Sequence, residues 1–453
     1  MATVKPFAAL RPKPELAEKI CELPYDVMSS DEARGLAAGN PLSFLRVSKP
    51  EIDLPPGTDM YAPEVYAKGR ENFQKLIRDG ALQQDPQPCF YLYRQIMGRH
   101  SQTGLVALAS CEEYLRGVIK KHELTHPDKE DDRTRHIEAL DSQTGPAFLA
   151  YRALRTVDEF IAKKTSKAPE IDFIARDGVR HTSWTIRDAK EMRFIETEFA
   201  KVPAFYIADG HHRSAAAARV YLTRNAAAGV PTAVEPGILP GGKSTRTSEA
   251  VEHSIANRGG MMPPSTAGGT PAATGAGHSG QYLAVIAPHD RMQILPYNRV
   301  LKDLNGWTPE QVLEILGTVF AMDQNGSGVP SRNHEIGFYL QGKWHKLIFR
   351  QKWLATDDPL EQLDVTLLQK NVFEPVFGIT DPRKDHRIHF VGGIRGTAEL
   401  EKLVDRGEAA CAFSLFPTRM EDLMSVVDAG GIMPPKSTWF EPKLRDGMFC
   451  HLI

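Results

Sequence analysis

The chain has 453 residues, in which 55 Lys and Arg residues stand against 57 Asp and Glu residues to give a formal net charge of −2. At roughly 100–200 residues per domain this length allows several domains, and the 25% of charged residues is typical of a folded protein. The near-neutral balance offers no basic field to a nucleic-acid backbone, so we do not expect a nucleic-acid partner.

The sequence also lacks the marks of export or membrane insertion. No uncharged apolar run approaches the ~18 residues that a membrane span requires, and the amino terminus has no long apolar segment. The five cysteines are odd in number, far apart and never in a C-x-x-C pair: they are Cys21, Cys89, Cys111, Cys411 and Cys450. We therefore expect a cytoplasmic protein with reduced cysteines, without membrane partners, a disulfide framework or a structural zinc site.

The amino-terminal part alternates helical and strand patterns. Apolar residues at helical spacing predict a helix over 63–80, which Gly80 would end. Short apolar runs predict strands over 89–94, 104–109 and 114–119. Alternation of this kind is typical of an α/β or α+β protein.

Residues 122–126 read His-Glu-Leu-Thr-His, which formally matches the zinc-protease pattern H-E-x-x-H. That chemistry needs both histidines on one helix, and Pro127 disfavours helical geometry at His126. Glu123 instead follows a predicted strand among polar residues, a suitable place for a general base. A solvated loop carboxylate explains Glu123 equally well.

Residues 205–219 carry the strongest functional pattern. An apolar strand, 205–208, meets a helix-forming stretch through the turn Asp209-Gly210. A helix that begins near His211 would direct free N–H groups and its positive dipole end toward the end of the strand. With three cationic or potentially cationic side chains, His211, His212 and Arg213, in the first turn, we predict a phosphate-binding site.

A second phosphate-loop pattern, G-x-x-x-x-G-K-[ST], occurs at residues 237–244. It lacks a buried strand before it, so we interpret the match as coincidental. Residues 259–280 contain no Asp, Glu, Lys or Arg and are mostly small residues and proline, which predicts a dispensable linker. We thus expect an amino-terminal lobe over 1–236, an insertion over 237–280 and a carboxy-terminal lobe over 281–453.

The carboxy-terminal lobe repeats the mixture of elements. Strands are predicted over 281–286 and 335–340, and a helix over 308–316 with Thr308 as its cap. After a helical pattern over 419–427, a proline-stiffened tail presents Lys436, Ser437 and Thr438, which could hold a carboxylate or phosphate or simply form a terminal connector. The predicted fold class is a mixed α/β, or α+β, protein in two lobes.

The segment around Asp209–Arg213 resembles the phosphate-binding box of the ParB/sulfiredoxin superfamily. Its Asp-Gly-His-His-Arg form is similar to that of archaeal free serine kinases, which also have a His-Glu pair upstream and a Pro-Lys-Ser/Thr-Thr segment near the end. Here these are matched by His122 and Glu123 and by residues 435–438. This resemblance implies a ParB-like nucleotide-binding core.

Over nearly its full length the chain is more similar to a widespread bacterial family known only as a domain of unknown function. The segments that carry this similarity are Leu23–Val27, Asn40 and Pro41, Lys121–Thr125, Asp209–Arg213, Leu295–Val300, Lys302–Asn305 and Pro434–Lys443. The kinase likeness rests on three short motifs within the same chain.

The kinase resemblance implies phosphoryl transfer between a nucleotide and the hydroxyl of free L-serine or a similar hydroxy amino acid, with Mg²⁺. It implies Glu123 as the base and Asp209 as a second catalytic residue. It further implies nucleotide binding by Gly210, His211, His212 and Arg213, and substrate binding by His122, Lys436, Ser437 and Thr438. Those kinases convert ADP to AMP and O-phosphoserine, but this chain is much longer, so the donor, ADP or ATP, and the direction stay open.

Two rival functions remain from the sequence alone. The first is a non-enzymatic nucleotide-binding switch, because other ParB-like proteins are clamps regulated by nucleotide. The second is a zinc-dependent hydrolase that uses His122 and His126. In the kinase interpretation no protein-bound metal site is expected beyond the Mg²⁺ that accompanies the nucleotide.

Overall fold

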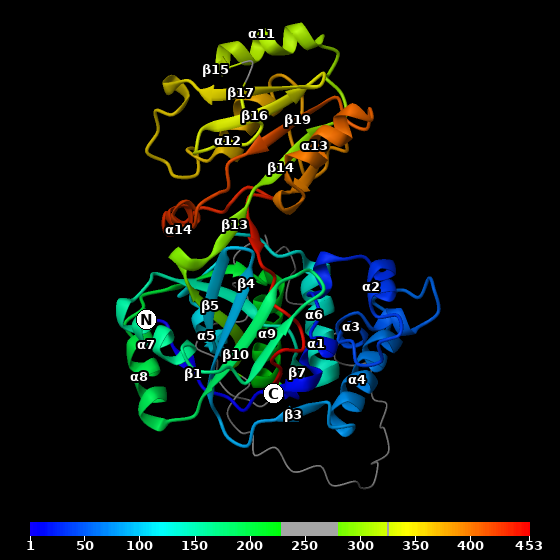
Figure 1. Cartoon of the computed structure of the whole chain (residues 1–453), viewed down its shortest axis with the longest axis vertical. Coiled ribbons are helices and arrows are strands. Elements are labelled where there is room, and N and C mark those ends of the chain that lie inside the picture. The colour runs from blue at the N-terminus through cyan, green and yellow to red at the C-terminus, as the bar shows by residue number, and fades with distance from the viewer. Residues whose placement is uncertain (228–279, 324–325) are drawn as a thin grey trace, which may run out of the picture.

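The computed structural model describes residues 1–227, 280–323 and 326–453, which form the two lobes of Figure 1. A large mixed sheet organises the lower lobe of that view, and a smaller antiparallel sheet organises the upper lobe. The predicted mixed α/β class in two lobes is therefore confirmed. The pattern at 237–244 and residues 259–279 of the predicted linker lie outside the described residues.

The large sheet combines parallel and antiparallel pairs. β11 pairs in parallel with β6, and β12 with β8, whereas the other neighbours are antiparallel. In spatial order the strands are β6 (Ile119–Lys120), β11 (Phe205–Asp209), β8 (Ala147–Tyr151), β12 (Gln281–Pro288), β5 (His100–Ser110), β4 (Phe90–Met97), β10 (Arg180–Ile186) and β9 (Ile171–Ile174), with β1 (Val4–Lys5) paired to β5.

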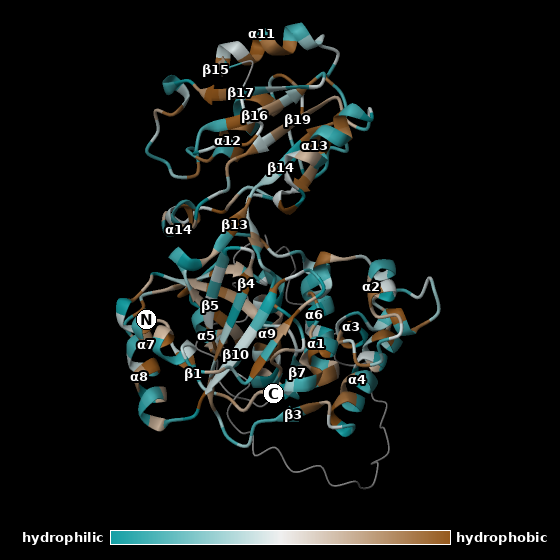
Figure 2. Ribbon diagram, viewed as in Figure 1, coloured by the Kyte–Doolittle hydropathy of each residue, from teal (hydrophilic) through white to brown (hydrophobic). Residues whose placement is uncertain are grey.

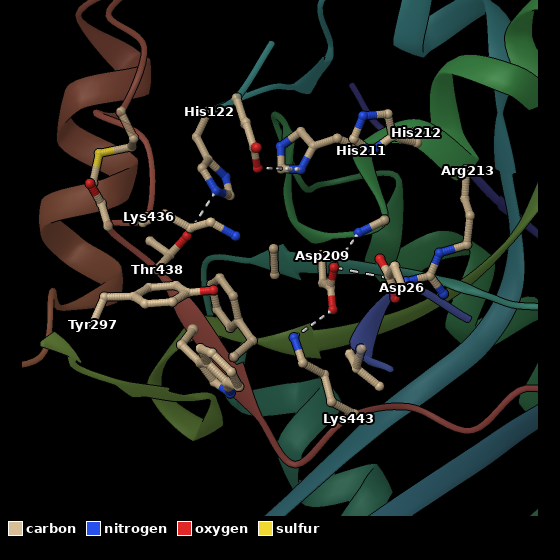
Figure 3. Close-up of a pocket in the computed structure, with 18 of the residues that line it drawn as sticks. Asp26, His122, Asp209, His211, His212, Arg213, Tyr297, Lys436, Thr438 and Lys443 are labelled. Carbon is tan, nitrogen blue, oxygen red and sulfur yellow. Dashed lines mark hydrogen bonds and ion pairs between the residues drawn. The ribbon is translucent and has the colours of Figure 1, made fainter. Parts of the chain in front are cut away.

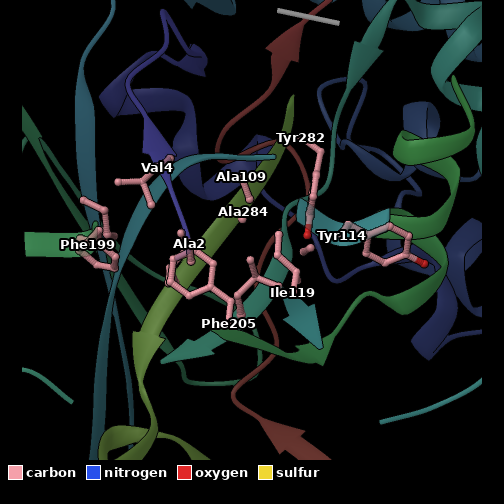
Figure 4. Close-up of a cluster of buried hydrophobic side chains, with 14 of the residues drawn as sticks. Ala2, Val4, Ala109, Tyr114, Ile119, Phe199, Phe205, Tyr282 and Ala284 are labelled. Carbon is pink, nitrogen blue, oxygen red and sulfur yellow. The ribbon is translucent and has the colours of Figure 1, made fainter. Parts of the chain in front are cut away.

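Both faces of this sheet are buried. Successive side chains of a strand point to opposite faces, so one strand shows the burial of both. In β5, Leu105 and Ala107 join one core while Val106 and Leu108 join the other. Figure 4 shows the first core, in which Phe205 packs near Ile119. Near-continuous apolar runs in these strands follow from burial on two sides.

Helices from distant parts of the chain cover the two faces. One face packs against helices that include α5 (Cys111–Leu115), α7 (Arg155–Thr165), α8 (Ala189–Phe199) and α9 (His211–Ala227). The other packs against α1 (Ala17–Ile20), α14 (Met420–Asp428) and the end of the chain. Beside the sheet lie α2 (Ser30–Leu36), α3 (Leu45–Ser48), α4 (Pro63–Arg78) and α6 (Pro127–Leu140). In Figure 2 these outer helices carry both hydrophilic and hydrophobic residues, as one-sided burial requires.

The second sheet is antiparallel throughout its described pairs. Its order is β15 (Phe320–Asp323), β17 (Lys343–Phe349), β16 (Glu335–Leu340), β19 (Cys411–Leu415), β14 (Tyr297–Leu301) and β18 (Ile388–Gly392). Its helices are α11 (Pro309–Val319), α12 (Asp364–Leu368) and α13 (Gly396–Asp405). The predicted cap of α11 is present: the Thr308 hydroxyl accepts a hydrogen bond from the Gln311 N–H at 3.3 Å.

Two sequence predictions differ from the structure. The strand predicted over 114–119 is confined to β6, because the Ser110 hydroxyl accepts from the Glu113 N–H and caps the short helix α5 at 111–115. The predicted boundary at residue 281 also fails to separate the sheets. β12 begins there and pairs with β5 and β8, so it completes the large sheet before the chain enters the second lobe.

The end of the chain returns from the second lobe to the first (Figure 1). β20 (Trp439–Glu441) pairs with β13 (Gln293–Leu295), and β21 (His451–Leu452) pairs with β7 (Ser142–Gln143). Phe449 is fully buried in the core of the large sheet. This return places the tail beside the turn after β11. No helix among residues 1–227, 280–323 and 326–453 has the length and apolar character needed to cross a membrane.

Candidate functional site

A pocket of about 320 Å³ opens where the tail meets the turn between β11 and α9 (Figure 3). All ten of the predicted site residues line it, although they come from three separate stretches of the chain. They are His122, Glu123, Asp209, Gly210, His211, His212, Arg213, Lys436, Ser437 and Thr438. The structure thus brings the sequence candidates together in one cavity.

The turn after β11 is built for close packing. Gly210 has a φ of +88°, and a Cβ there would lie 3.0 Å from Arg213 Nε and 3.1 Å from the Ala147 Cα. Glycine is required on both counts. The Ser214 N–H bonds the Gly210 carbonyl at 2.9 Å, so α9 begins at once, with the N–H groups of its first turn directed to the pocket end of the helix.

Asp209 lies at the centre of a charged network at the end of β11. Its Oδ1 accepts the Gly210 N–H at 2.7 Å, and its Oδ2 accepts from Lys443 Nζ at 3.1 Å. Arg213 Nη2 lies 3.8 Å from Oδ1. Burial by itself would raise the pKa of Asp209, but the two cations outweigh it and hold the pKa well below its usual range.

The histidines of the turn differ from the sequence prediction in charge. Burial lowers the pKa of His212 to about 4 and that of His211 well below its ordinary value. Both rings are therefore neutral near pH 7, and the predicted cluster of three cations is corrected to one, Arg213. The burial that removes the charge depends on tertiary packing, which residue type does not show.

His122 is held in one orientation. It is buried, its Nδ1 lies 2.7 Å from the Ile207 carbonyl, and a carbonyl can only accept, so Nδ1 carries the proton. Nε2 then accepts from the Thr438 hydroxyl at 3.2 Å, the contact dashed in Figure 3. Burial lowers the pKa of His122 to about 4, which keeps the ring neutral.

Glu123 is more open, with 53% of its side chain exposed. Its Oε2 lies 3.9 Å from His211 Nδ1. Partial desolvation raises the pKa of Glu123, while Lys436 opposes that rise. A carboxylate of raised pKa that faces a polar cavity is suited to accept a proton.

The tail contributes a strained loop. Lys436 has a φ of +56° and carries its Nζ 5.5 Å from the centre of the Tyr297 ring. Ser437 is buried, and its hydroxyl donates to the Pro434 carbonyl at 2.5 Å, so this side chain holds the loop. Lys436 is therefore left to present its charge to the pocket.

The H-E-x-x-H arrangement is absent as a helical unit. His126 precedes α6, which begins at Pro127, and His122 lies in the loop before it, so the two are not on one helix. The His126 backbone N–H donates to His212 Nε2 at 3.1 Å. The zinc-hydrolase hypothesis based on His122 and His126 is therefore wrong in its geometry.

Sequence reasoning assigned no role to several other residues that line the pocket. These include Tyr25, Asp26, Lys129, Tyr297, Trp439 and Lys443. Most lie in the segments that carry the family similarity, which was the available signal. Asp26 makes no hydrogen bond or ion pair with any residue that the structure describes. Tyr297 packs edge-on to Trp439, with 4.8 Å between the ring centres.

A family model described as "Protein of unknown function (DUF1015)" matches residues 4–236 and 252–366. The chain belongs to this family. The matched DUF1015 region includes Glu123 and the turn at Asp209–Arg213, whereas the tail with Lys436 and Lys443 lies beyond it. No curated protein matches the chain.

Several solved structures show a distant likeness. A variant of free serine kinase in complex with AMP is 12% identical, with a TM-score of 0.32, over 74% of this chain and 87% of that one. Another variant of that kinase, in complex with ADP, is 11% identical with a TM-score of 0.30 over 74% and 87%. SbnI from Staphylococcus aureus, truncated at its C-terminus, is 9% identical with a TM-score of 0.35 over 75% and 85%.

Proposed function

We propose that this protein is a phosphotransferase that moves a phosphoryl group between a nucleotide, ADP or ATP, and the hydroxyl of free L-serine or a similar hydroxy amino acid. The observation that carries the proposal is that Glu123, a carboxylate of raised pKa, faces the same pocket as the N-terminus of α9 and Lys436. Phosphoryl transfer needs these three elements: a base, anion-binding groups and a cation for the substrate.

The pocket charge supports an anionic ligand. Four Lys and Arg residues line it, Lys129, Arg213, Lys436 and Lys443, against three carboxylates, Asp26, Glu123 and Asp209. The imidazoles add no charge because burial keeps them neutral. Phosphates would meet the amides at the start of α9, where neutral histidines donate and accept without opposing the helix dipole.

In the transfer step, the serine hydroxyl oxygen forms a bond to the terminal phosphorus of the nucleotide. Glu123 takes the hydroxyl proton, and the bond from that phosphorus to the bridging oxygen breaks, so AMP leaves from ADP, or ADP from ATP. Lys436 is suited to hold the substrate carboxylate, and the Thr438 hydroxyl could join it by turning its proton away from His122 Nε2. In reverse, protonated Glu123 returns the proton to serine as O-phosphoserine is dephosphorylated.

Mg²⁺ prefers oxygen ligands from one or two carboxylates together with phosphates, and it would neutralise phosphate charge. The pocket fits that demand: Asp26 has an exposed carboxylate with no partner among the described residues. Asp209 fits it less well, because Lys443 and the Gly210 N–H already occupy its two oxygens. We therefore assign Asp26 to the ion and Asp209 to holding Lys443 and Arg213 in place.

The test is incubation of the pure protein with ADP or ATP, Mg²⁺ and a panel of hydroxy amino acids, followed by phosphorus NMR. The proposal predicts a new phosphomonoester signal with L-serine or a close analogue. Nucleotide binding without turnover of any hydroxy amino acid would contradict it and would favour the non-enzymatic nucleotide switch.

A further inference from the structure

We propose that His122, Glu123 and His211 form a binding site for a divalent transition-metal ion such as Zn²⁺ or Co²⁺. Each residue can place one ligand atom so that the three atoms lie within 4.8 Å of one another. Two imidazoles and one carboxylate are a ligand set that such ions favour, and Mg²⁺ does not. This proposal does not rest on the assignment of nucleotide and Mg²⁺ above, although the metal site shares Glu123 with it.

The three ligands converge through the fold. His122 and Glu123 lie in the loop after β6, and His211 is the first residue of α9 after β11. β6 and β11 are parallel neighbours, with Phe205 opposite Ile119, so both strands deliver their following loops to the same edge of the sheet. Figure 3 shows His122 and His211 together on one side of the pocket, away from Lys443.

The two rings are held for coordination in different ways. His122 Nδ1 donates to the Ile207 carbonyl, which leaves the Nε2 lone pair directed into the pocket. Metal-binding histidines commonly donate their other ring N–H in this way, and the hydrogen bond orients the ring. His211 is only 4% exposed; its Nδ1 lies 3.9 Å from Glu123 Oε2, and its Nε2 has no hydrogen-bond partner in the described part of the chain. A buried imidazole with an unpartnered nitrogen is uncommon unless a ligand completes it.

Binding requires only small adjustments. Ligand atoms around zinc lie about 2.0–2.2 Å from the ion, so the three ligand atoms of His122, Glu123 and His211 must move slightly closer together. Glu123 can supply this movement because 53% of its side chain is exposed. The Thr438 hydroxyl, which now donates to His122 Nε2, would give up that bond to the ion. The pocket itself leaves a fourth position open to water or substrate, as in catalytic zinc sites.

This arrangement replaces the linear H-E-x-x-H motif with a three-dimensional one. His211 takes the place that the motif would give to His126, whose ring stacks on His212 with 6.1 Å between centres. Because Glu123 is shared, an ion in this site would compete with a substrate hydroxyl for the same carboxylate.

The experiment is calorimetric titration of the metal-free full chain with Zn²⁺, repeated with Co²⁺ and its visible absorption. We expect one equivalent to bind tightly, with Co²⁺ gaining the strong absorption of a low-symmetry site. His211→Ala and Glu123→Gln should each weaken binding by about 100-fold or more, while His126→Ala, the matched control, should leave it within a factor of about two. Far-UV circular dichroism checks the fold, and the exposed Glu123 provides a variant that does not disturb the core.

The proposal is overturned if the wild-type protein binds Zn²⁺ no better than the folded Glu123→Gln variant. It is equally overturned if His126→Ala loses the ion while His211→Ala keeps it. Neither readout involves nucleotide or turnover, so a failed metal titration and a failed phosphotransferase assay are separate results.

Discussion

Lys443 donates a hydrogen bond to Asp209 at 3.1 Å across 234 residues of sequence, and in doing so joins the tail of the chain to the turn after β11. Asp209 in turn accepts the Gly210 N–H and faces Arg213. The tail therefore contributes a charge that fixes the geometry at the start of α9 in addition to the Lys436 loop.

Lys443→Met should destabilise the protein by about 2 kcal/mol near pH 7, the usual worth of a hydrogen bond to a charged group. The folded-state pKa of Asp209 is depressed, so its contribution is fully present above the unfolded pKa of about 3.9 and is lost progressively as the pH falls from there through the lower folded-state pKa. Urea unfolding from pH 7 downward should show the difference between wild type and variant persist to about pH 3 and shrink only at lower pH, where Asp209 becomes protonated in the folded state. Lys436→Met is the control and should change stability little; equal losses in both variants would contradict the assignment.

Gly210→Ala should destabilise the turn by about 2 kcal/mol or more, since the new methyl group meets a positive φ and two close neighbours. Gly178 has a similar φ of +79° but open space around it, so Gly178→Ala isolates the cost of the backbone conformation. Thermal unfolding of the two variants measures the contact cost as their difference. If the two variants unfold at the same temperature, a Cβ at position 210 does not make the close contacts that the structure indicates.

Arg213→Ala should weaken nucleotide binding by about 1.5–3 kcal/mol, because it removes the one permanent charge in the first turn of α9. Without Arg213, the negative charges of Asp26 and Asp209 would also repel the phosphates more strongly. Arg219→Ala, on an outer part of the same helix, provides the control for loss of positive charge. Calorimetry that finds unchanged nucleotide affinity in a folded Arg213→Ala protein would remove Arg213 from the binding site.

Asp446 is buried near Arg213, and its carboxyl makes the stability of the protein depend on pH. Burial raises the pKa of Asp446 to about 7 despite nearby Arg213, and its Oδ1 has no hydrogen-bond partner among the described residues. The folded state therefore holds a proton that the unfolded chain releases near pH 4, so this carboxyl lowers stability progressively as the pH rises from about 4 to 7.

Asp446→Asn should abolish that pH-dependent loss. The variant should melt at a higher temperature than wild type at pH 8, with the gap closing toward pH 4.5. Differential scanning calorimetry across this range makes the comparison. A variant less stable than wild type at pH 8 would show that Asp446 is charged and paired in the folded protein.

Local signals in the sequence predicted much of the site. The strand, turn and helix from Phe205 to α9 follow from an apolar run, a tight-turn pair and good helix formers. Thr308 and Pro309 predicted the start of α11 for the same reason: caps act within one turn. The ten candidates met in one pocket because they occupy segment ends that converge.

The features that the sequence did not predict depend on packing between distant segments. The pairing of Lys443 with Asp209 depends on the return of the tail, and no local pattern encodes it. The neutral state of His211 depends on burial, which residue type does not reveal. The wrong strand at 114–119 came from the β-branched residues Val118 and Ile119, while the Ser110 cap favoured a helix just before them.

Glu123 is the proposed base of the phosphoryl transfer. Glu123→Gln nearly keeps the size of the side chain and removes only its ability to take a proton.

The decisive measurement compares transfer and nucleotide affinity in Glu123→Gln and wild-type protein. With L-serine, nucleotide and Mg²⁺, phosphorus NMR should show transfer reduced by about 10²-fold or more, while calorimetry shows nucleotide affinity unchanged. In the wild-type protein the rate should rise with pH through the raised pKa of Glu123 and then level off. Full turnover by Glu123→Gln would show that Glu123 is not the base and is a solvated loop carboxylate.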